Sequence, residues 1–97
     1  MLRYLNILIL GVIWMLAGCA SIPSQEMADA RTELRAAEAA NAVRYAPEPL
    51  AEARKYLADA ERRLELGDYA AARRNADQAR LYAISARRQA QREMADH

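Results

Sequence analysis

Cys19 is the residue with the clearest chemistry, because it is the only cysteine among the 97 residues of the chain. Its thiol, once deprotonated, is a nucleophile that can be modified covalently. The apolar run Ile7 to Leu16 precedes it, followed by the small residues Ala17 and Gly18. Small residues after a short apolar run suit the site of a signal peptidase. This stretch therefore predicts a processing site at a cysteine.

The sequence Leu16-Ala17-Gly18-Cys19 resembles the lipobox of bacterial lipoproteins. In that family the thiol receives a diacylglycerol, the chain is cut before the cysteine, and the new amine is acylated. The resemblance implies a cleaved signal peptide over residues 1–18 and a lipid anchor on Cys19. Because Ala20 rather than Asp follows, the sorting habit of many Gram-negative lipoproteins implies the outer membrane, on its periplasmic side. An ordinary signal peptide with a cysteine near its cleavage site is the alternative.

The apolar run is too short for a permanent transmembrane helix. It spans about ten residues, whereas a helix that crosses the bilayer core needs about twenty. A single cation, Arg3, precedes the run, as in a signal peptide. The rest of the chain has no second cysteine for a disulfide, so its stability must come from helix packing or from association.

Three apolar stripes at helical spacing follow a short tether, residues 19–23. The first predicts a helix over residues 24–45, with Asn41 on the same stripe. The other two predict a hairpin over residues 46–97, with helices of about 47–66 and 69–94. The stripes are Met27, Ala30, Leu34, Ala37 and Tyr45; Leu50, Ala53, Leu57, Ala60 and Leu64; and Tyr69, Ala72, Ala76, Ala79, Ala83, Ala86 and Ala90.

Residues that start and stop helices lie between these stripes. Pro47 and Pro49 end the first helix and are tolerated in the first turn of the second. Gly67 suits a left-handed helix end, and Asp68 can cap the helix that follows it. Ser24 is expected to cap the first helix in the same way. The fold class is therefore all-α: an antiparallel helical hairpin, or a small three-helix bundle if residues 24–45 pack against it.

The lipobox, the stretch from Tyr45 to Leu50, the turn Gly67-Asp68-Tyr69 and the alanine-rich helix after it resemble a family of small bacterial lipoproteins. That family has a helical domain of unknown function, which sometimes precedes an OmpA-like peptidoglycan-binding domain. This sequence shows no OmpA-like domain after the hairpin, so the resemblance does not carry cell-wall binding over to it. The hairpin alone is similar to one tetratricopeptide helix pair. The family implies no catalytic residues.

The remaining polar residues do not predict an enzyme. The only histidine is His97, so a histidine-centred metal site or a Ser-His-Asp triad cannot form within one chain. Two of the three glycines, Gly11 and Gly18, belong to the signal peptide, which leaves no glycine-rich phosphate loop. We expect no catalytic residues, cofactor, metal or small-molecule substrate.

Arginines gather on one side of the last predicted helix. At about 100° per residue, six of them fall within an arc of about 140°, away from the alanine stripe. Leu81 and Ile84 lie in the same arc, and arginine with apolar residues is typical of protein interfaces. The alternative is that residues 24–45 cover Leu81 and Ile84 and the arginines are solvated. The candidate partner-binding residues are Arg73, Arg80, Leu81, Ile84, Arg87 and Arg88.

Charge is unevenly divided, since acidic residues outnumber basic ones over residues 20–68 and the reverse holds over residues 69–97. Complementary faces of one bundle explain this better than an anion site. We expect a non-catalytic, lipid-anchored cell-envelope protein that serves as a structural or adaptor module, with a periplasmic protein partner or self-association and no nucleic acid. The alternative is a membrane-active or envelope-stress lipoprotein whose basic last helix lies on anionic lipid.

Overall fold

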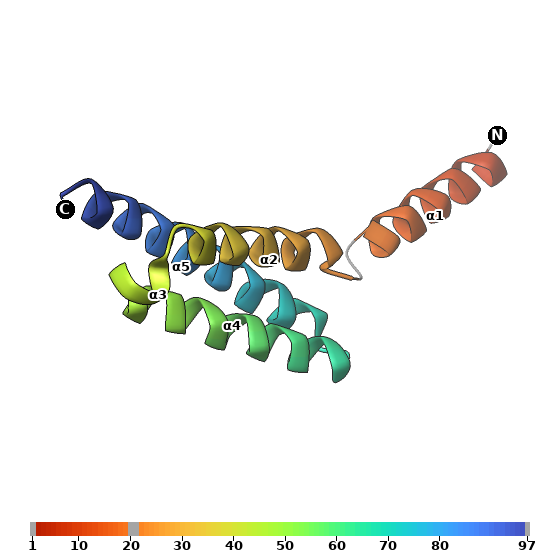
Figure 1. Ribbon diagram of the computed structural model, residues 1–97. Coiled ribbons are helices and arrows are strands. Elements are labelled where there is room, and N and C mark those ends of the chain that lie inside the picture. Colours follow the sequence, from red (N-terminus) through yellow and green to blue (C-terminus); the bar gives the residue numbers. More distant parts are fainter. Residues whose placement is uncertain (1, 20–21, 97) are drawn as a thin grey trace.

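The computed structural model describes residues 2–19 and 22–96, with side chains for residues 2–12 and 22–96. Within these residues the fold is all-α (Figure 1). The helices are α1 (Leu2–Cys19), α2 (Ser24–Ala39), α3 (Ala42–Tyr45), α4 (Pro47–Glu65) and α5 (Tyr69–Ala95).

Helices α4 and α5 form the predicted hairpin, and their bounds lie within one residue of the predicted ones. Pro47 begins α4, where its missing amide hydrogen costs no helical hydrogen bond. Gly67 has φ +79°, the left-handed conformation that a residue with a side chain rarely adopts. The carboxylate of Asp68 accepts a hydrogen bond from the amide of Ala71 at 3.2 Å. These residues end α4, turn the chain and cap α5 as the sequence predicts.

Helix α5 is the central element of the bundle, and alanines form the face that it buries. The six alanines of the predicted stripe after Tyr69 are each at most 2% exposed: Ala72, Ala76, Ala79, Ala83, Ala86 and Ala90. Methyl side chains allow the backbones of neighbouring helices to approach closely. Tyr69, the first residue of the same stripe, is 37% exposed, because it begins the helix at the end of the bundle.

Helix α2 packs along α5, so the bundle has three helices and not the hairpin alone. Met27 and Ala30 of α2 share a buried cluster with Leu57 and Ala60 of α4 and with Ala76 and Ala79 of α5. A second cluster joins Ala37, Ala42, Ala46 and Leu50 to Ala86 and Ala90. The order of the contacts shows that α2 runs parallel to α5 and that α4 runs antiparallel to both. Leu34 contacts both clusters and links them.

The single helix expected over residues 24–45 is not continuous, and the expectation is wrong from residue 40 onward. The helix stops at Ala39, and Asn41 adopts φ +63° before the short helix α3 begins at Ala42. Asparagine tolerates this left-handed conformation better than most residues. The break turns Ala42 and Ala46 into the core, where both are fully buried. Asn41 itself is exposed and does not continue the apolar face of the helix.

The expected cap at Ser24 is also wrong. Ser24 is already the first residue of α2, the N-cap position is Pro23, and no side chain accepts a capping hydrogen bond there. Pro23 is buried at this point. Its carbonyl accepts a hydrogen bond from the amide of Met27 at 3.0 Å, which closes the first turn without a side-chain cap.

Helix α1 projects from the bundle and packs on no other described helix (Figure 1). Its apolar side chains from Leu2 to Val12 are at least half exposed. Among the described residues, none of the helices has both the length and the apolar character needed to cross a membrane.

Candidate functional site

The arginines of α5 fall into two groups with different surroundings. On the side that faces α2, Nε of Arg73 donates a hydrogen bond to Oε1 of Glu26 at 3.2 Å. About four turns further toward the C-terminus, Arg87 forms an ion pair with Glu33, with Nη2 and Oε2 3.7 Å apart. All four side chains are at most 35% exposed. Acidic groups of α2 therefore pair with basic groups of α5, in keeping with the complementary faces that the charge pattern favours.

One residue further along, the arginines point elsewhere. A step of one residue rotates a side chain by about 100° around the helix axis, so Arg74 and Arg88 leave the side that Arg73 and Arg87 share. Arg74, Leu81, Arg88 and Arg92 are all exposed. We call these four residues the outer α5 face.

The outer α5 face has a regular spacing. Arg74, Leu81 and Arg88 are seven residues apart, which places them close to one line along the helix, and Arg92 follows one turn later. Leu81 is 51% exposed. Within the described residues, the three arginines of this face form no ion pair or hydrogen bond. Their guanidinium groups can therefore bind carboxylates or phosphates from outside the chain.

The structure separates the six candidate residues inferred from the sequence. Leu81 and Arg88 lie together on the outer α5 face, whereas Arg73 and Arg87 lie in the interface with α2. Arg80 is seven residues from both Arg73 and Arg87, so it lies on their side of α5, whereas Ile84 lies between the two regions; both are half-buried. Arg74 and Arg92 complete the face in their place. The seven-residue step from Leu81 back to Arg74 is the sequence signal that points to Arg74.

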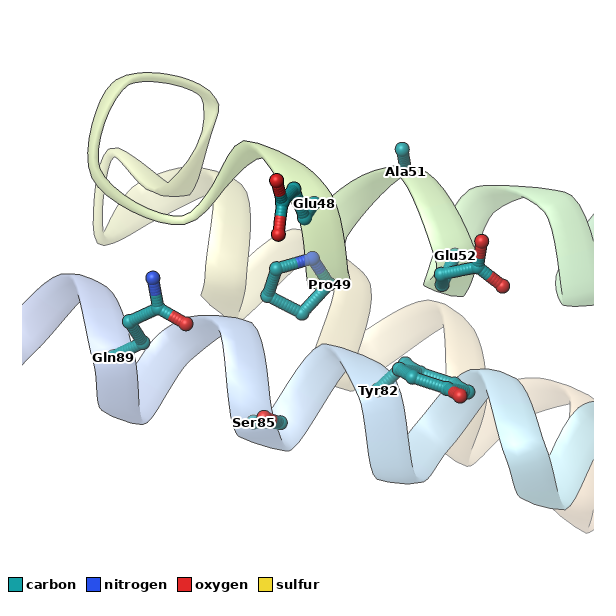
Figure 2. Close-up of a pocket in the computed structure, with 7 residues that line it drawn as sticks. All are labelled: Glu48, Pro49, Ala51, Glu52, Tyr82, Ser85 and Gln89. Carbon is teal, nitrogen blue, oxygen red and sulfur yellow. The ribbon is translucent and has the colours of Figure 1, made fainter.

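A shallow hollow lies between the start of α4 and the middle of α5 (Figure 2). Glu48, Pro49, Ala51 and Glu52 of α4 line one wall, and Tyr82, Ser85 and Gln89 of α5 line the other. The ring of Tyr82 is held in place because it stacks on Tyr56, with ring centroids 5.5 Å apart and planes 10° apart. Ser85 also borders the outer α5 face, so an acidic wall adjoins a basic surface.

The lipidation site inferred from the sequence lies at the other end of the chain. The backbone of Leu16, Ala17, Gly18 and Cys19 belongs to α1, but their side chains lie outside the described residues, as do residues 20 and 21 of the tether. No group of three or more His, Cys, Asp or Glu side chains that could hold a metal ion occurs in the part of the chain that the structure describes.

The described residues form an all-α three-helix bundle preceded by an apolar helix, and the bundle exposes the arginines of the outer α5 face. Residues 25–97, from α2 to the end of the chain, match the model of the family described as Domain of unknown function (DUF4398). The chain belongs to this family. No curated protein and no solved structure matches it.

Proposed function

We propose that this protein is a non-catalytic, lipid-anchored protein of the bacterial cell envelope, which acts as a structural or adaptor module for a periplasmic protein partner. The observation that carries the proposal is the outer α5 face. There, Arg74 on one side and Arg88 and Arg92 on the other flank a half-exposed leucine and have no partner among the described residues, while Arg73 and Arg87 of the same helix are paired with α2. The bundle packs against the sides of α5 that α2 and α4 cover, so the outer α5 face is available for binding.

The chemistry of the outer α5 face indicates the partner. Arginine and large apolar side chains are enriched at protein interfaces, where carboxylates pair with guanidinium groups in two parallel hydrogen bonds. A partner helix or loop with an apolar side chain over Leu81 and acidic residues about two turns away on each side could contact Leu81 and pair with Arg74 and Arg88. The adjacent glutamates, Glu48 and Glu52, would favour a basic residue at the edge of that segment.

The lipobox supplies the location in this proposal. Acylation at Cys19 would hold the bundle on a membrane, since two or more acyl chains give stable anchoring where one gives only marginal binding. By resemblance to the sorting of many Gram-negative lipoproteins, Ala20 after the cysteine favours the outer membrane and its periplasmic side. A tethered adaptor meets a partner in the same membrane or cell wall at high effective concentration, so a small interface is sufficient.

A second candidate function, binding of α5 to anionic lipid, also fits the three arginines of the outer α5 face. A helix that lies on a membrane normally buries a broad apolar face in the interface. In α5 the apolar face consists of alanines that α2 and α4 already cover, and Leu81 is the exposed large apolar residue of the outer face. The burial of the alanine face therefore favours a protein partner over lipid.

Site-specific photo-crosslinking in intact cells tests the adaptor proposal. A photoreactive residue at Gln78, which lies on the exposed side of α5 one turn before Leu81, should capture one envelope protein. The double variant Leu81→Asp, Arg88→Glu should abolish that product with no loss of helicity, because both side chains are exposed. Val43→Asp is the matched control, since Val43 is 58% exposed on α3, away from the outer α5 face.

Two outcomes would contradict the proposal. An unchanged crosslink in the Leu81→Asp, Arg88→Glu variant would show that the outer α5 face is not the binding surface. A crosslink to lipid alone would favour the membrane-binding alternative. Separately, Cys19→Ala should move the protein out of the membrane fraction, and retention there would show that acylation is not the anchor.

A further inference from the structure

The N-terminal segment joins the bundle at one of its two ends. Helix α2 begins at the end of the bundle where α4 turns into α5, and α1 joins the bundle at that same end (Figure 1). The last turn of α5 and the short helix α3 lie at the opposite end (Figure 1). Whether α1 is retained or removed at Cys19, the segment that leads to the proposed anchor enters the bundle at the start of α2, at the end where α4 turns into α5. We call this the tether end.

An ion pair between α2 and α4 also places the start of α2 beside the turn. Arg31 of α2 pairs with Glu61 of α4 at 3.5 Å, so the two residues lie at one level of the bundle. With a rise of about 1.5 Å per residue, the start of α2 lies about 10 Å beyond that level and the end of α4 about 6 Å beyond it. The entry of the chain into the bundle and the turn at Gly67 therefore lie close to the same plane.

Apolar side chains from both segments are exposed at the tether end. Ile22, just before α2, is 56% exposed, and Leu66, in the turn, is 71% exposed. Tyr69, at the start of α5, is 37% exposed. A tyrosine and two large aliphatic side chains in this position match the residues that proteins place at a membrane interface, where the phenol stays near the headgroups and the aliphatic groups enter the acyl region.

We propose that the tether end rests on the phospholipid bilayer, with Leu66 and Ile22 inserted into the interface and Tyr69 at headgroup level. This inference rests on the proposed membrane anchor, which supplies the bilayer at this end of the bundle. Charged groups near the turn have both signs, since Arg63 pairs with Asp68 at 4.0 Å and Arg62 pairs with Asp59 at 3.7 Å. Docking by the tether end is therefore apolar and does not require anionic lipid.

The docking sets the orientation of the outer α5 face. Helix α5 has 27 residues, which corresponds to about 40 Å along its axis. With its first turn on the bilayer, its C-terminal half projects away from the lipid. Arg88 and Arg92 are then held beyond the headgroups, where they face a periplasmic protein and not the membrane that anchors the chain.

A tryptophan placed at each end of the bundle tests the orientation. The chain has one tryptophan, Trp14, so the full-length gene with Trp14→Phe gives a background without tryptophan fluorescence. Leu66→Trp reports on the tether end, and Met94→Trp, at a residue 51% exposed near the opposite end, is the matched control. The membrane-bound protein from cells is reconstituted into phosphatidylcholine vesicles that contain a lipid spin-labelled at a shallow acyl position.

The expected result is quenching of the Leu66→Trp fluorescence that is at least about twofold stronger than that of Met94→Trp, with a shift of its emission to shorter wavelength. Tyr69→Trp, a conservative change, should be quenched as well and guards against distortion of the turn by Leu66→Trp. Circular dichroism confirms that each variant is folded.

Vesicle flotation separates failure of the docking from failure of the anchor. Protein that floats with the vesicles, but whose tryptophans at residues 66 and 69 are unquenched, would overturn the docking and leave the anchor in place. Equal quenching at residues 66 and 94 would show that the bundle lies flat, and would also overturn it. Protein that does not float at all would overturn both the anchor and the docking that depends on it.

Discussion

The two sides of α5 carry the same residue type and use it differently. Arg87 and Arg88 are neighbours in the chain, but Arg87 pairs with Glu33 of α2, while Arg88 is exposed and has no ion pair within the described residues. The same contrast separates Arg73 from Arg74. The inner side of α5 thus supports the fold, and the outer α5 face contributes little to it. Charge that folding does not need is available for binding.

The buried alanine face of α5 explains why larger side chains on that face are expected to destabilise the bundle. Its buried residues are alanines, and the large, fully buried side chains of the bundle are few: Met27 and Leu50, with Pro23. Alanine burial contributes little by area, at about 0.8 kcal/mol for a methyl-sized group. The stability of the bundle therefore depends on close approach of the helix backbones, which a larger side chain would prevent.

The largest loss of stability is expected from Ala86→Leu, which tests the packing of the buried alanine face. Ala86 is fully buried in a cluster with Ala37 and Leu50, and three added carbons there would push α5 away from its neighbours. We expect a loss of about 2–3 kcal/mol in the free energy of unfolding. Gln78→Leu, the same side chain at an exposed position of α5, should change it by less than about 0.5 kcal/mol.

Urea unfolding of the two variants, followed by circular dichroism, measures this difference. Equal midpoints for Ala86→Leu and Gln78→Leu would mean that the close packing of α5 does not hold the bundle together, and the contrast between its two sides would be lost.

A smaller effect is expected from Arg87→Gln. Oε2 of Glu33 and Nε of Arg87 are both buried, and neither has a hydrogen-bond partner within the described residues, so the charge attraction is the main interaction of the pair. Removing Arg87 leaves the Glu33 carboxylate without its counter-ion and should cost about 1 kcal/mol. The control Arg74→Gln removes an exposed arginine without an ion pair and should leave the free energy of unfolding nearly unchanged.

A double-mutant cycle with Glu33→Gln isolates the coupling between the two side chains. The loss in the double variant should be smaller than the sum of the two single losses. Strict additivity would show that Glu33 and Arg87 do not interact, and that the charges facing α2 contribute no more to the fold than those of the outer α5 face.

The sequence alone was sufficient to predict the helices whose apolar stripes are continuous. In α4, Leu50, Ala53, Leu57 and Ala60 are buried as their spacing predicts, and the alanines of α5 follow the same rule. The break at Asn41 was missed, because periodicity continues through it to Tyr45. The left-handed conformation of Asn41 depends on tertiary packing, because it allows Ala42 and Ala46 to be buried against α5.

The candidate interface was predictable only in part, for a geometric reason. Helical spacing identified the arc that holds all six arginines of α5, but it does not say which edge of that arc a neighbouring helix covers. Helix α2 covers the edge with Arg73 and Arg87. Residues one step further around the helix stay exposed, so position relative to α2, and not residue type, decides which arginines remain for a partner.

The smallest effect is expected from Arg88→Gln, and its sign is opposite to that of Arg87→Gln. Arg88 and Arg92 are four residues apart on the exposed surface of α5, a spacing at which like charges repel by about 0.2–0.5 kcal/mol. Removing one of them should raise the free energy of unfolding by that amount at low ionic strength. In high salt, screening should remove the gain. A loss of stability in Arg88→Gln would show that the outer α5 face supports the fold, and would remove the reason for assigning that face to a partner.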